Sequence, residues 1–284
     1  MGRSAVTPAQ AGVQSALESR RVLDSRLRGN DDATPFSAAS RREGAVAVLL
    51  LHRAGASSWA WRPHLDALGA EIRAVALDLP GHGESPGPAL ASIEAMADVA
   101  GAAIERLGLG RAVVAGHSMG GAVALSLAQR RPELVAGVLM VCSGARLRVA
   151  APLLEAVRAG ARPELMARFL FSRGAPKEVV DAHLPRLFDA PPEVVATDME
   201  ACDRFDGEPG LPGLAVPVRL IAGTEDVLTP PRLSRRLAER VPAGAAQIRV
   251  VEGAGHMLPL EHPQVVVEEL RALAAAVAEG GRSA

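Results

Sequence analysis

The stretch that decides the fold reads AVVAGHSMGG and covers residues 112–121. Its first four residues are apolar, as in a buried strand, and an alanine- and leucine-rich run that ends before Pro132 follows as a predicted helix. Between them, GHSMG fits the pattern G-x-S-x-G, in which a sharp strand-to-helix turn exposes a serine oxygen at the helix N-terminus. The pattern alone is weak, since an ordinary serine in a glycine-rich turn also fits it. The strand and the helix on either side make it specific and predict Ser118 as a nucleophile.

Outward from this motif, short apolar runs alternate with longer helical runs. Expected strands cover residues 46–51, 72–77, 112–115, 138–141, 218–222 and 248–251, and expected helices cover 58–68, 92–107, 119–130, 231–240 and 263–277. Continuous apolar strands that alternate with helices are typical of a parallel sheet with helices on both faces. The sequence therefore predicts an α/β fold with a mostly parallel central sheet.

Two segments depart from this rhythm. Residues 145–213 are rich in proline and apolar residues, helical in parts and without a clear strand, which favours a helical cap inserted between two parts of the core, 45–144 and 214–284. A run of ordinary connecting helices is the alternative. Residues 1–44 are polar and charged and have no clear period, so we expect a disordered N-terminal extension there.

Composition excludes several classes of function. The 284 residues include 49% hydrophobic ones, as in globular proteins, and 31 basic against 32 acidic residues give a net charge of −1. No basic stripe suggests a nucleic-acid partner, and no apolar run reaches the length of a membrane span. Two cysteines, Cys142 and Cys202, do not make a disulfide scaffold, and no cysteine–histidine cluster has metal-site spacing. Without a recognisable signal peptide, we expect a soluble cytoplasmic protein without a metal; composition indicates no oligomeric state.

A serine nucleophile needs a base and an acid, which in this kind of fold follow it in the order Asp or Glu, then His. His256 follows the last expected strand in GAGHM, on a loop at the carboxyl edge where Ser118 also lies; His183 and His262 are less well placed. Asp226 follows the strand 218–222 at the same edge, with Glu225 as the competing carboxylate. Asp226 as a turn or helix-capping residue is the structural alternative.

Acyl transfer also needs two N–H donors for the oxyanion. The residue after the nucleophile, Met119, supplies one through its backbone. The other is expected from the loop after the strand 46–51, which reads HRAG over residues 52–55, and Ala54 is the candidate.

Together these motifs resemble the α/β-hydrolase superfamily, in its branch of small esterases, lactonases and C–C bond hydrolases. The matching segments run in order along the chain: LLH at 50–52, DLPGHGES at 78–85, the Ser118 motif, GTED at 223–226 with Pro230, GH at 255–256 and EHP at 261–263. The resemblance implies no cofactor, a helical cap over the pocket and an acyl-enzyme. It also favours Asp226 over Glu225 by the spacing before Pro230. The segment 78–85 looks like a structural signature without chemistry.

The chain departs from this family at two places. Arg53 stands where the family usually has glycine. Three interpretations are open: Arg53 reshapes the oxyanion loop, it points into the pocket and favours an acidic substrate, or its side chain is solvated. We favour the solvated side chain. The family normally has two strands before the strand at 46–51, and residues 1–44 show no good candidate, so we expect the sheet to lack its first hairpin.

The candidate substrate-binding residues are His52, Arg53 and His117 near the expected nucleophile, and Phe169 in the cap. Cap residues 165, 166 and 169–171 are apolar and either line an acyl pocket or pack the cap onto the core.

The expected reaction is hydrolysis of a small-molecule carboxylic ester, thioester or lactone. A C–C bond hydrolase or a cofactor-free perhydrolase would use the same triad, and a non-catalytic binding or signalling protein could keep it. Serine at the nucleophile position argues against epoxide hydrolases and haloalkane dehalogenases, which use aspartate.

Overall fold

The computed structural model describes residues 37–40, 45–160 and 169–280. Within them, seven strands form one sheet in the order β1-β3-β2-β4-β5-β6-β7. The strands are β1 (Ser37–Ser40), β2 (Val46–Leu51), β3 (Ile72–Asp78), β4 (Ala112–His117), β5 (Val135–Val141), β6 (Val218–Gly223) and β7 (Ala246–Val251). Strands β2 to β7 pair in parallel, and β1 alone is antiparallel to its neighbour β3. The predicted α/β fold with a mostly parallel sheet is confirmed.

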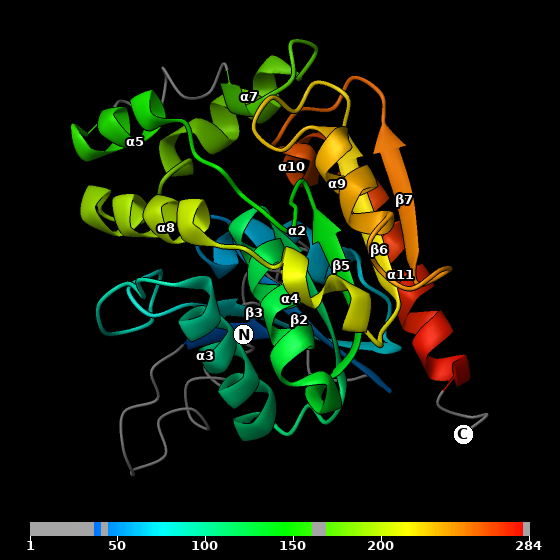
Figure 1. Cartoon of the computed structure of the whole chain (residues 1–284). Coiled ribbons are helices and arrows are strands. Elements are labelled where there is room, and N and C mark those ends of the chain that lie inside the picture. Colours follow the sequence, from blue (N-terminus) through cyan, green and yellow to red (C-terminus); the bar gives the residue numbers. More distant parts are fainter. Residues whose placement is uncertain (1–36, 41–44, 161–168, 281–284) are drawn as a thin grey trace, which may run out of the picture.

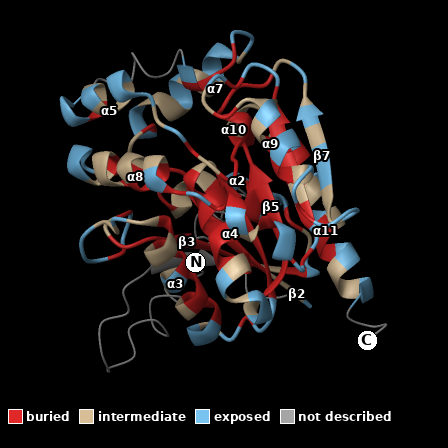
Figure 2. Cartoon of the chain, in the orientation of Figure 1, coloured by how far each residue is buried: buried red, intermediate tan, exposed pale blue. Residues whose placement is uncertain are grey.

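The central strands are buried on both faces. Every residue of β4 and β5 is buried, which explains their continuous apolar sequences. At the edge of the sheet, β7 keeps all its residues at least partly exposed, and Figure 2 shows this change from the red centre to the tan and blue edge. The interior of the sheet is therefore the rigid part of the molecule, and the loops that leave β4 and β5 start from it.

Helices cover both faces of the sheet, as expected. One face packs against α3 (Ile93–Arg106), α4 (Met119–Arg130) and α9 (Pro231–Ala238). The other packs against α2 (Arg62–Ala67), α10 (Leu258–Glu261) and α11 (Pro263–Gly280). Ser92 caps the N-terminus of α3, because its Oγ accepts from Ala95 N at 3.2 Å.

Strand β1 corrects the expectation that residues 1–44 contain no strand of the sheet. The sequence of β1, Ser-Ala-Ala-Ser, lacks the apolar pattern of a strand, yet Ser37 pairs with Asp78 and Ser40 with Val75. Tertiary pairing with β3 therefore overrides weak local propensity. The other residues of the expected disordered extension, 1–36 and 41–44, lie outside the described residues.

Between β5 and β6 the described chain is helical. This insertion, residues 145–213, contains α5 (Ala151–Arg158), α7 (Lys177–His183), the 3₁₀ turn η3 (Leu184–Arg186), α8 (Pro192–Arg204) and the 3₁₀ turn η4 (Glu208–Gly213). In its described part, the β-structure is an isolated bridge between Arg146 and Asp206. Figure 1 shows α5, α7 and α8 on the side toward which β5 and β7 point. The insertion thus lies on the side of the sheet's carboxyl edge.

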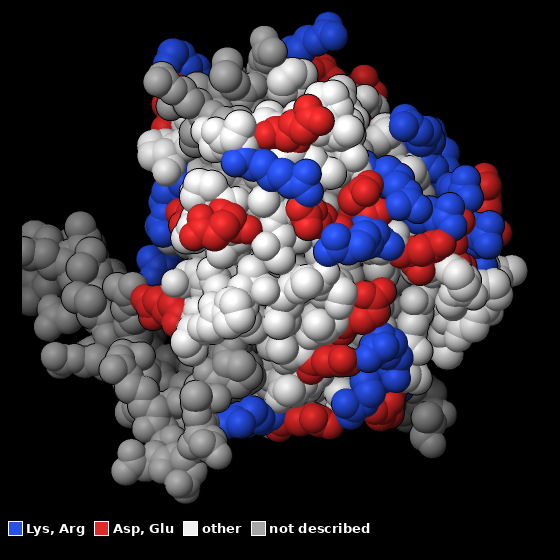
Figure 3. Space-filling model, turned by 60° about the vertical axis from the view of Figure 1, so that its left-hand side comes forward, with Lys and Arg blue, Asp and Glu red and all other residues white. Residues whose placement is uncertain are grey.

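The surface charge and the character of the helices agree with two expectations from composition: a balanced charge and the absence of an apolar run long enough to span a membrane. On the face drawn in Figure 3, acidic and basic side chains are interspersed over the described residues rather than separated into patches of one sign. Among the described helices, none combines the length and the apolar character that a bilayer span requires.

Candidate active site

Ser118 lies in a strained turn between β4 and α4. Its backbone has φ 53° and ψ −114°, an unfavourable conformation for a residue with a side chain. Close approach explains the flanking glycines: a Cβ on Gly116 would lie 2.0 Å from the Gly120 backbone, and one on Gly120 would lie 2.2 Å from the Leu51 carbonyl oxygen. Ser118 N donates to Val141 O at 2.9 Å, which ties the turn to β5. The sheet itself therefore enforces the strain.

Asp226 and His256 meet at the carboxyl edge of the sheet. Asp226 lies on the loop after β6, and its Oδ2 is 2.9 Å from Nδ1 of His256, which lies on the loop after β7. Thr229 also binds the carboxylate, through its hydroxyl at 2.6 Å and its N–H at 2.8 Å. Burial by itself would raise the pKa of Asp226, but the charge of His256 and these hydrogen bonds outweigh it and hold the pKa well below its usual range. The carboxylate is ionised, and it orients the imidazole through Nδ1.

The loop that carries His256 is held from several sides. His117 Nε2 donates to His256 O at 2.8 Å, and Met257 N donates to Leu170 O at 2.9 Å. Glu261 Oε2 accepts from Gly255 N at 3.2 Å. The same oxygen accepts from the N–H of residue 172 in the insertion, also at 3.2 Å. The loop is thus fixed both to the core and to the insertion.

Three loops bring the candidate residues together. The rings of His117 and His256 lie 5.1 Å apart, and Ser143, two residues after β5, donates its hydroxyl to Ser118 O at 2.7 Å. Since Asp226 occupies Nδ1 of His256, Nε2 is the nitrogen left for proton transfer. The Asp226–His256 pair can therefore supply an oriented base near the strained turn, although among the described residues no hydrogen bond joins His256 to Ser118 Oγ.

Cys142 lies beneath this pair. Its sulfur and the ligand atoms of Asp226 and His256 lie within 4.8 Å of one another, so they form a possible metal cluster in the described part of the chain. Burial, together with the charge of Asp226, raises the pKa of the Cys142 thiol well above its usual value, so it is not a thiolate. Asp226 and His256 are already bonded to each other. The donor chemistry therefore fits a buried thiol packed behind an acid–base pair better than a metal site.

The candidate oxyanion donors come from different elements. Met119 is the first residue of α4, and Ala54 lies in the loop after β2. Among the described residues, neither backbone N–H has a recorded acceptor. The contact of Gly120 with Leu51 brings the start of α4 against the end of β2. The backbone N–H groups of Ala54 and Met119 are thus both free to donate, and the elements that carry them, the end of β2 and the start of α4, lie against each other.

His52 positions the loop after β2. Its Nδ1 lies 2.9 Å from Arg53 O, and its Nε2 accepts from Leu79 N at 3.2 Å. Burial, with a smaller effect of His82, lowers the pKa of His52 to about 3, so the ring is neutral and both nitrogens are used by the backbone. His52 has no nitrogen left for a substrate, which favours a positioning role over the binding role expected from the sequence.

The same loop is tied to the insertion. Gly55 N donates to Asp198 Oδ2 at 2.8 Å, and Ala190 N donates to Gly55 O at 3.2 Å. A Cβ at Gly55, where φ is 66°, would lie 2.8 Å from the Phe188 ring. The insertion therefore fixes the position of Ala54.

The expectation that Arg53 is solvated is wrong, because its side chain is only 6% exposed. One terminal nitrogen of its guanidinium donates to Ala54 O at 2.9 Å and the other to Leu187 O in the insertion. The Phe188 ring lies 5.6 Å from the guanidinium carbon. Burial lowers the pKa of Arg53 to about 10, which leaves the group charged at neutral pH. Arg53 therefore lies between the β2 loop and the insertion.

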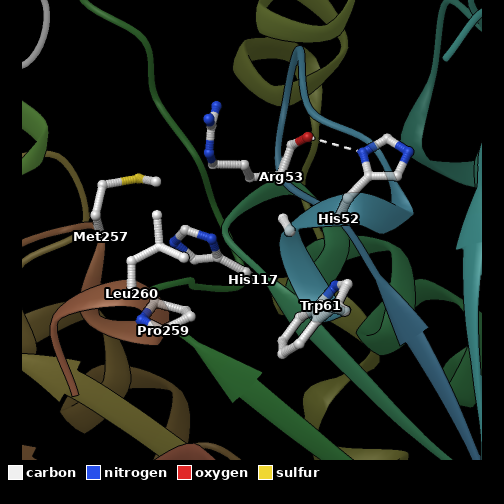
Figure 4. Close-up of a pocket in the computed structure, with 8 residues that line it drawn as sticks. His52, Arg53, Trp61, His117, Met257, Pro259 and Leu260 are labelled. Carbon is white, nitrogen blue, oxygen red and sulfur yellow. Dashed lines mark hydrogen bonds between the residues drawn. The ribbon is translucent and has the colours of Figure 1, made fainter. Parts of the chain in front are cut away.

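A small pocket opens beside these residues (Figure 4). Its volume is about 10 Å³, room for roughly one water molecule. The lining residues are His52, Arg53, Ala60, Trp61, His117, Met257, Pro259 and Leu260.

Only some of the expected substrate-binding residues line this pocket. Three of them, His52, Arg53 and His117, line it, whereas Phe169 does not and is 44% exposed. Positions 165 and 166 lie outside the described residues. No local pattern pointed to the supports that Thr229 and Asp198 provide, and Glu261 stood out only through the family resemblance.

Known proteins resemble the chain in sequence and in structure. A family model described as the alpha/beta hydrolase family matches residues 48–269. The pimeloyl-[acyl-carrier protein] methyl ester esterase of Neisseria meningitidis is 30% identical over 233 residues, which cover 76% of this chain and 89% of that protein. A thermophilic esterase from Thermogutta terrifontis superposes with a TM-score of 0.74 at 29% identity, over 85% of this chain and 93% of that one. The enol-lactonase from Burkholderia xenovorans shares the fold, with a TM-score of 0.75 at 23% identity, over 84% and 95% of the two chains.

Proposed function

This chain belongs to the alpha/beta hydrolase family, and we propose that it cleaves a small carboxylic ester, thioester or lactone through an acyl-enzyme on Ser118. The relatives named as esterases support a hydrolase of the ester type. The observation that carries the proposal is the buried Asp226–His256 hydrogen bond of 2.9 Å, at the same edge of the sheet as a serine with φ 53°.

In the proposed reaction, Ser118 Oγ attacks the carbonyl carbon while His256 Nε2 takes its proton. The negative charge that develops on the carbonyl oxygen is stabilised by the N–H groups of Ala54 and Met119. When the tetrahedral intermediate collapses, His256 returns the proton to the leaving oxygen or sulfur. A water molecule then attacks the acyl-enzyme while His256 takes a proton from it. As this second tetrahedral intermediate collapses, the bond from the acyl carbon to Ser118 Oγ breaks, His256 returns the proton to Oγ and the carboxylic acid leaves.

Asp226 supports this cycle through its charge. Its depressed pKa keeps the carboxylate ionised throughout the neutral range, and the anion stabilises the imidazolium that forms on His256. Thr229 completes the carboxylate's hydrogen bonds, so Asp226 keeps a single orientation toward Nδ1.

We propose that the insertion is the cap over this site. It contacts two loops that carry proposed catalytic groups: the Ala54 loop through Asp198 and the His256 loop through Leu170. Substrate selection would then depend on side chains of the cap as well as on the core.

The test is turnover of p-nitrophenyl esters from acetate to octanoate by the wild type and by Ser118→Ala. We expect the substitution to lower kcat by roughly 10³-fold or more with an unchanged thermal transition. A fluorophosphonate probe should label the wild type and not the variant. Labelling of Ser118 without turnover of any ester would contradict the proposal and favour a non-catalytic binding protein.

A further inference from the structure

Arg53 is a buried cation without an anionic partner. In the described part of the chain, no carboxylate forms an ion pair with its guanidinium, and its Nε has no hydrogen-bond acceptor. The carboxylate whose charge acts on it, Asp189, is already occupied, because it accepts from the Ser57 hydroxyl at 2.9 Å and from Arg186 Nε at 3.0 Å. Burying a charge without a partner of opposite sign is unfavourable, so such a group is expected to meet an anion when the protein works.

The location of Arg53 indicates which anion it meets. Its side chain lines the same pocket as His117 and Met257, the neighbours in sequence of the proposed nucleophile and base. In Figure 4 its aliphatic part runs from the β2 loop toward the side on which Met257 lies, and its guanidinium turns away from the His117 ring. It is also the residue before Ala54, a proposed oxyanion donor, so their Cα atoms are about 3.8 Å apart. The guanidinium also donates to Ala54 O at 2.9 Å, so the cation lies against the residue whose N–H is the proposed oxyanion donor.

The free N–H groups of Arg53 suit a carboxylate. A guanidinium has five N–H donors, and the recorded bonds to Ala54 O and Leu187 O use one on each terminal nitrogen. Nε–H and one further N–H on each terminal nitrogen remain. Nε–H is shielded from solvent, so a carboxylate would be bound by a remaining terminal N–H while the backbone bonds stay in place.

We propose that Arg53 determines specificity for an acyl group that ends in a carboxylate, so that the substrate is the half-ester of a short dicarboxylic acid. The proposal rests on the esterase function proposed above. The small pocket and the short distance from Arg53 to Ala54 favour a spacer of few carbons between the two carbonyl groups.

The test compares two esters with the same four-carbon acyl chain, monoethyl succinate and ethyl butyrate, by acid release in a pH-stat. We expect the ratio of their kcat/KM values, anionic over neutral, to fall by roughly 10- to 100-fold in Arg53→Met, since a charged hydrogen-bonded pair is lost. Arg106→Met, which removes an exposed arginine at the end of α3, is the matched control and should keep the wild-type ratio.

A binding measurement separates this inference from the esterase function. Free succinate should raise the Tm of the wild type and of Ser118→Ala, and should not raise that of Arg53→Met. An unchanged ester ratio in Arg53→Met, or a succinate shift that persists in it, would overturn the role of Arg53 while leaving the esterase function intact. The esterase function itself is tested separately, by turnover of the p-nitrophenyl esters in the wild type and in Ser118→Ala. If Arg53→Met does not fold, Arg53→Lys retains the charge without the planar fork, and should lower the same ratio.

Discussion

The turn at residues 116–121 and the loop at residues 52–57 lie at the same edge of the sheet, but they are held in different ways. The turn around Ser118 is fixed by the sheet: its glycines touch each other and the end of β2, and the Ser118 N–H bonds to β5. The β2 loop has a bond to the core, from Leu79 N to His52, and is otherwise tied to the insertion, through Asp198, Leu187 and the N–H of Ala190.

This difference separates the nucleophile from half of the proposed oxyanion site. Met119 belongs to the turn held by the sheet, whereas Ala54 belongs to the loop held by the insertion. Changes in the insertion should therefore affect stabilisation of the oxyanion and leave the conformation of Ser118 intact. Changes in the sheet contacts should remove both.

The strongest test of the sheet-held turn is Gly120→Ala. The added Cβ would lie 2.2 Å from Leu51 O, a backbone atom that cannot move without disturbing β2. We expect loss of almost all esterase activity and destabilisation of about 3 kcal/mol or more, measured by urea unfolding. Gly213→Ala, where an added Cβ meets nothing within 4 Å, is the control and should behave like the wild type. Equal stability of the two variants would mean that the close approach does not hold the turn.

The insertion-held loop is tested by Asp198→Asn. One carboxylate oxygen of Asp198 accepts from Gly55 N and lies 2.8 Å from His82 Nε2, and both side chains are buried. Asparagine keeps the shape and removes the charge, which should destabilise the protein by about 1 to 3 kcal/mol. We also expect a lower kcat with unchanged labelling of Ser118 by fluorophosphonate. Loss of labelling together with activity would contradict the separation of the two regions.

The effect of this substitution should depend on pH. Burial alone would lower the pKa of His82, but its hydrogen bond to Asp198 and the charge of that carboxylate raise it above the ordinary value. The folded protein then binds the proton more tightly than the unfolded chain does. The resulting stability is fully present below about pH 6.5 and is lost as the pH rises through the folded pKa. The difference between the wild type and Asp198→Asn should therefore be larger at pH 6 than at pH 8.5 in urea unfolding.

The same contrast explains what the sequence could predict. The turn around Ser118, and the placement of Asp226 and His256 after their strands, depend on local patterns and on the rule that parallel strands end at one edge. Those positions were recognisable because the chemistry and the structural context are written in neighbouring residues.

The errors concern residues whose environment comes from distant parts of the chain. Arg53 is buried because Leu187 and Phe188, more than 130 positions later, close over it, and no local pattern announces that contact. The strand β1 forms from Ser-Ala-Ala-Ser only because β3 offers it an edge. Asp198 reads as one more polar residue of α8, although it is fully buried.

The smallest effect is expected where the two modes of support meet, at Glu261. Its Oε2 accepts from Gly255 N in the His256 loop and from the N–H of residue 172 in the insertion, so it joins a loop of the core to the insertion. Glu261→Gln should lower kcat by about 3- to 10-fold with little change in KM, since a neutral amide is a weaker acceptor than a carboxylate. Glu268→Gln, which removes a charge from an exposed pair with Arg249, is the control. If both variants keep the wild-type kcat, the Glu261 bonds are not needed to hold the His256 loop, and the bond from Met257 N to Leu170 O is its tie to the insertion.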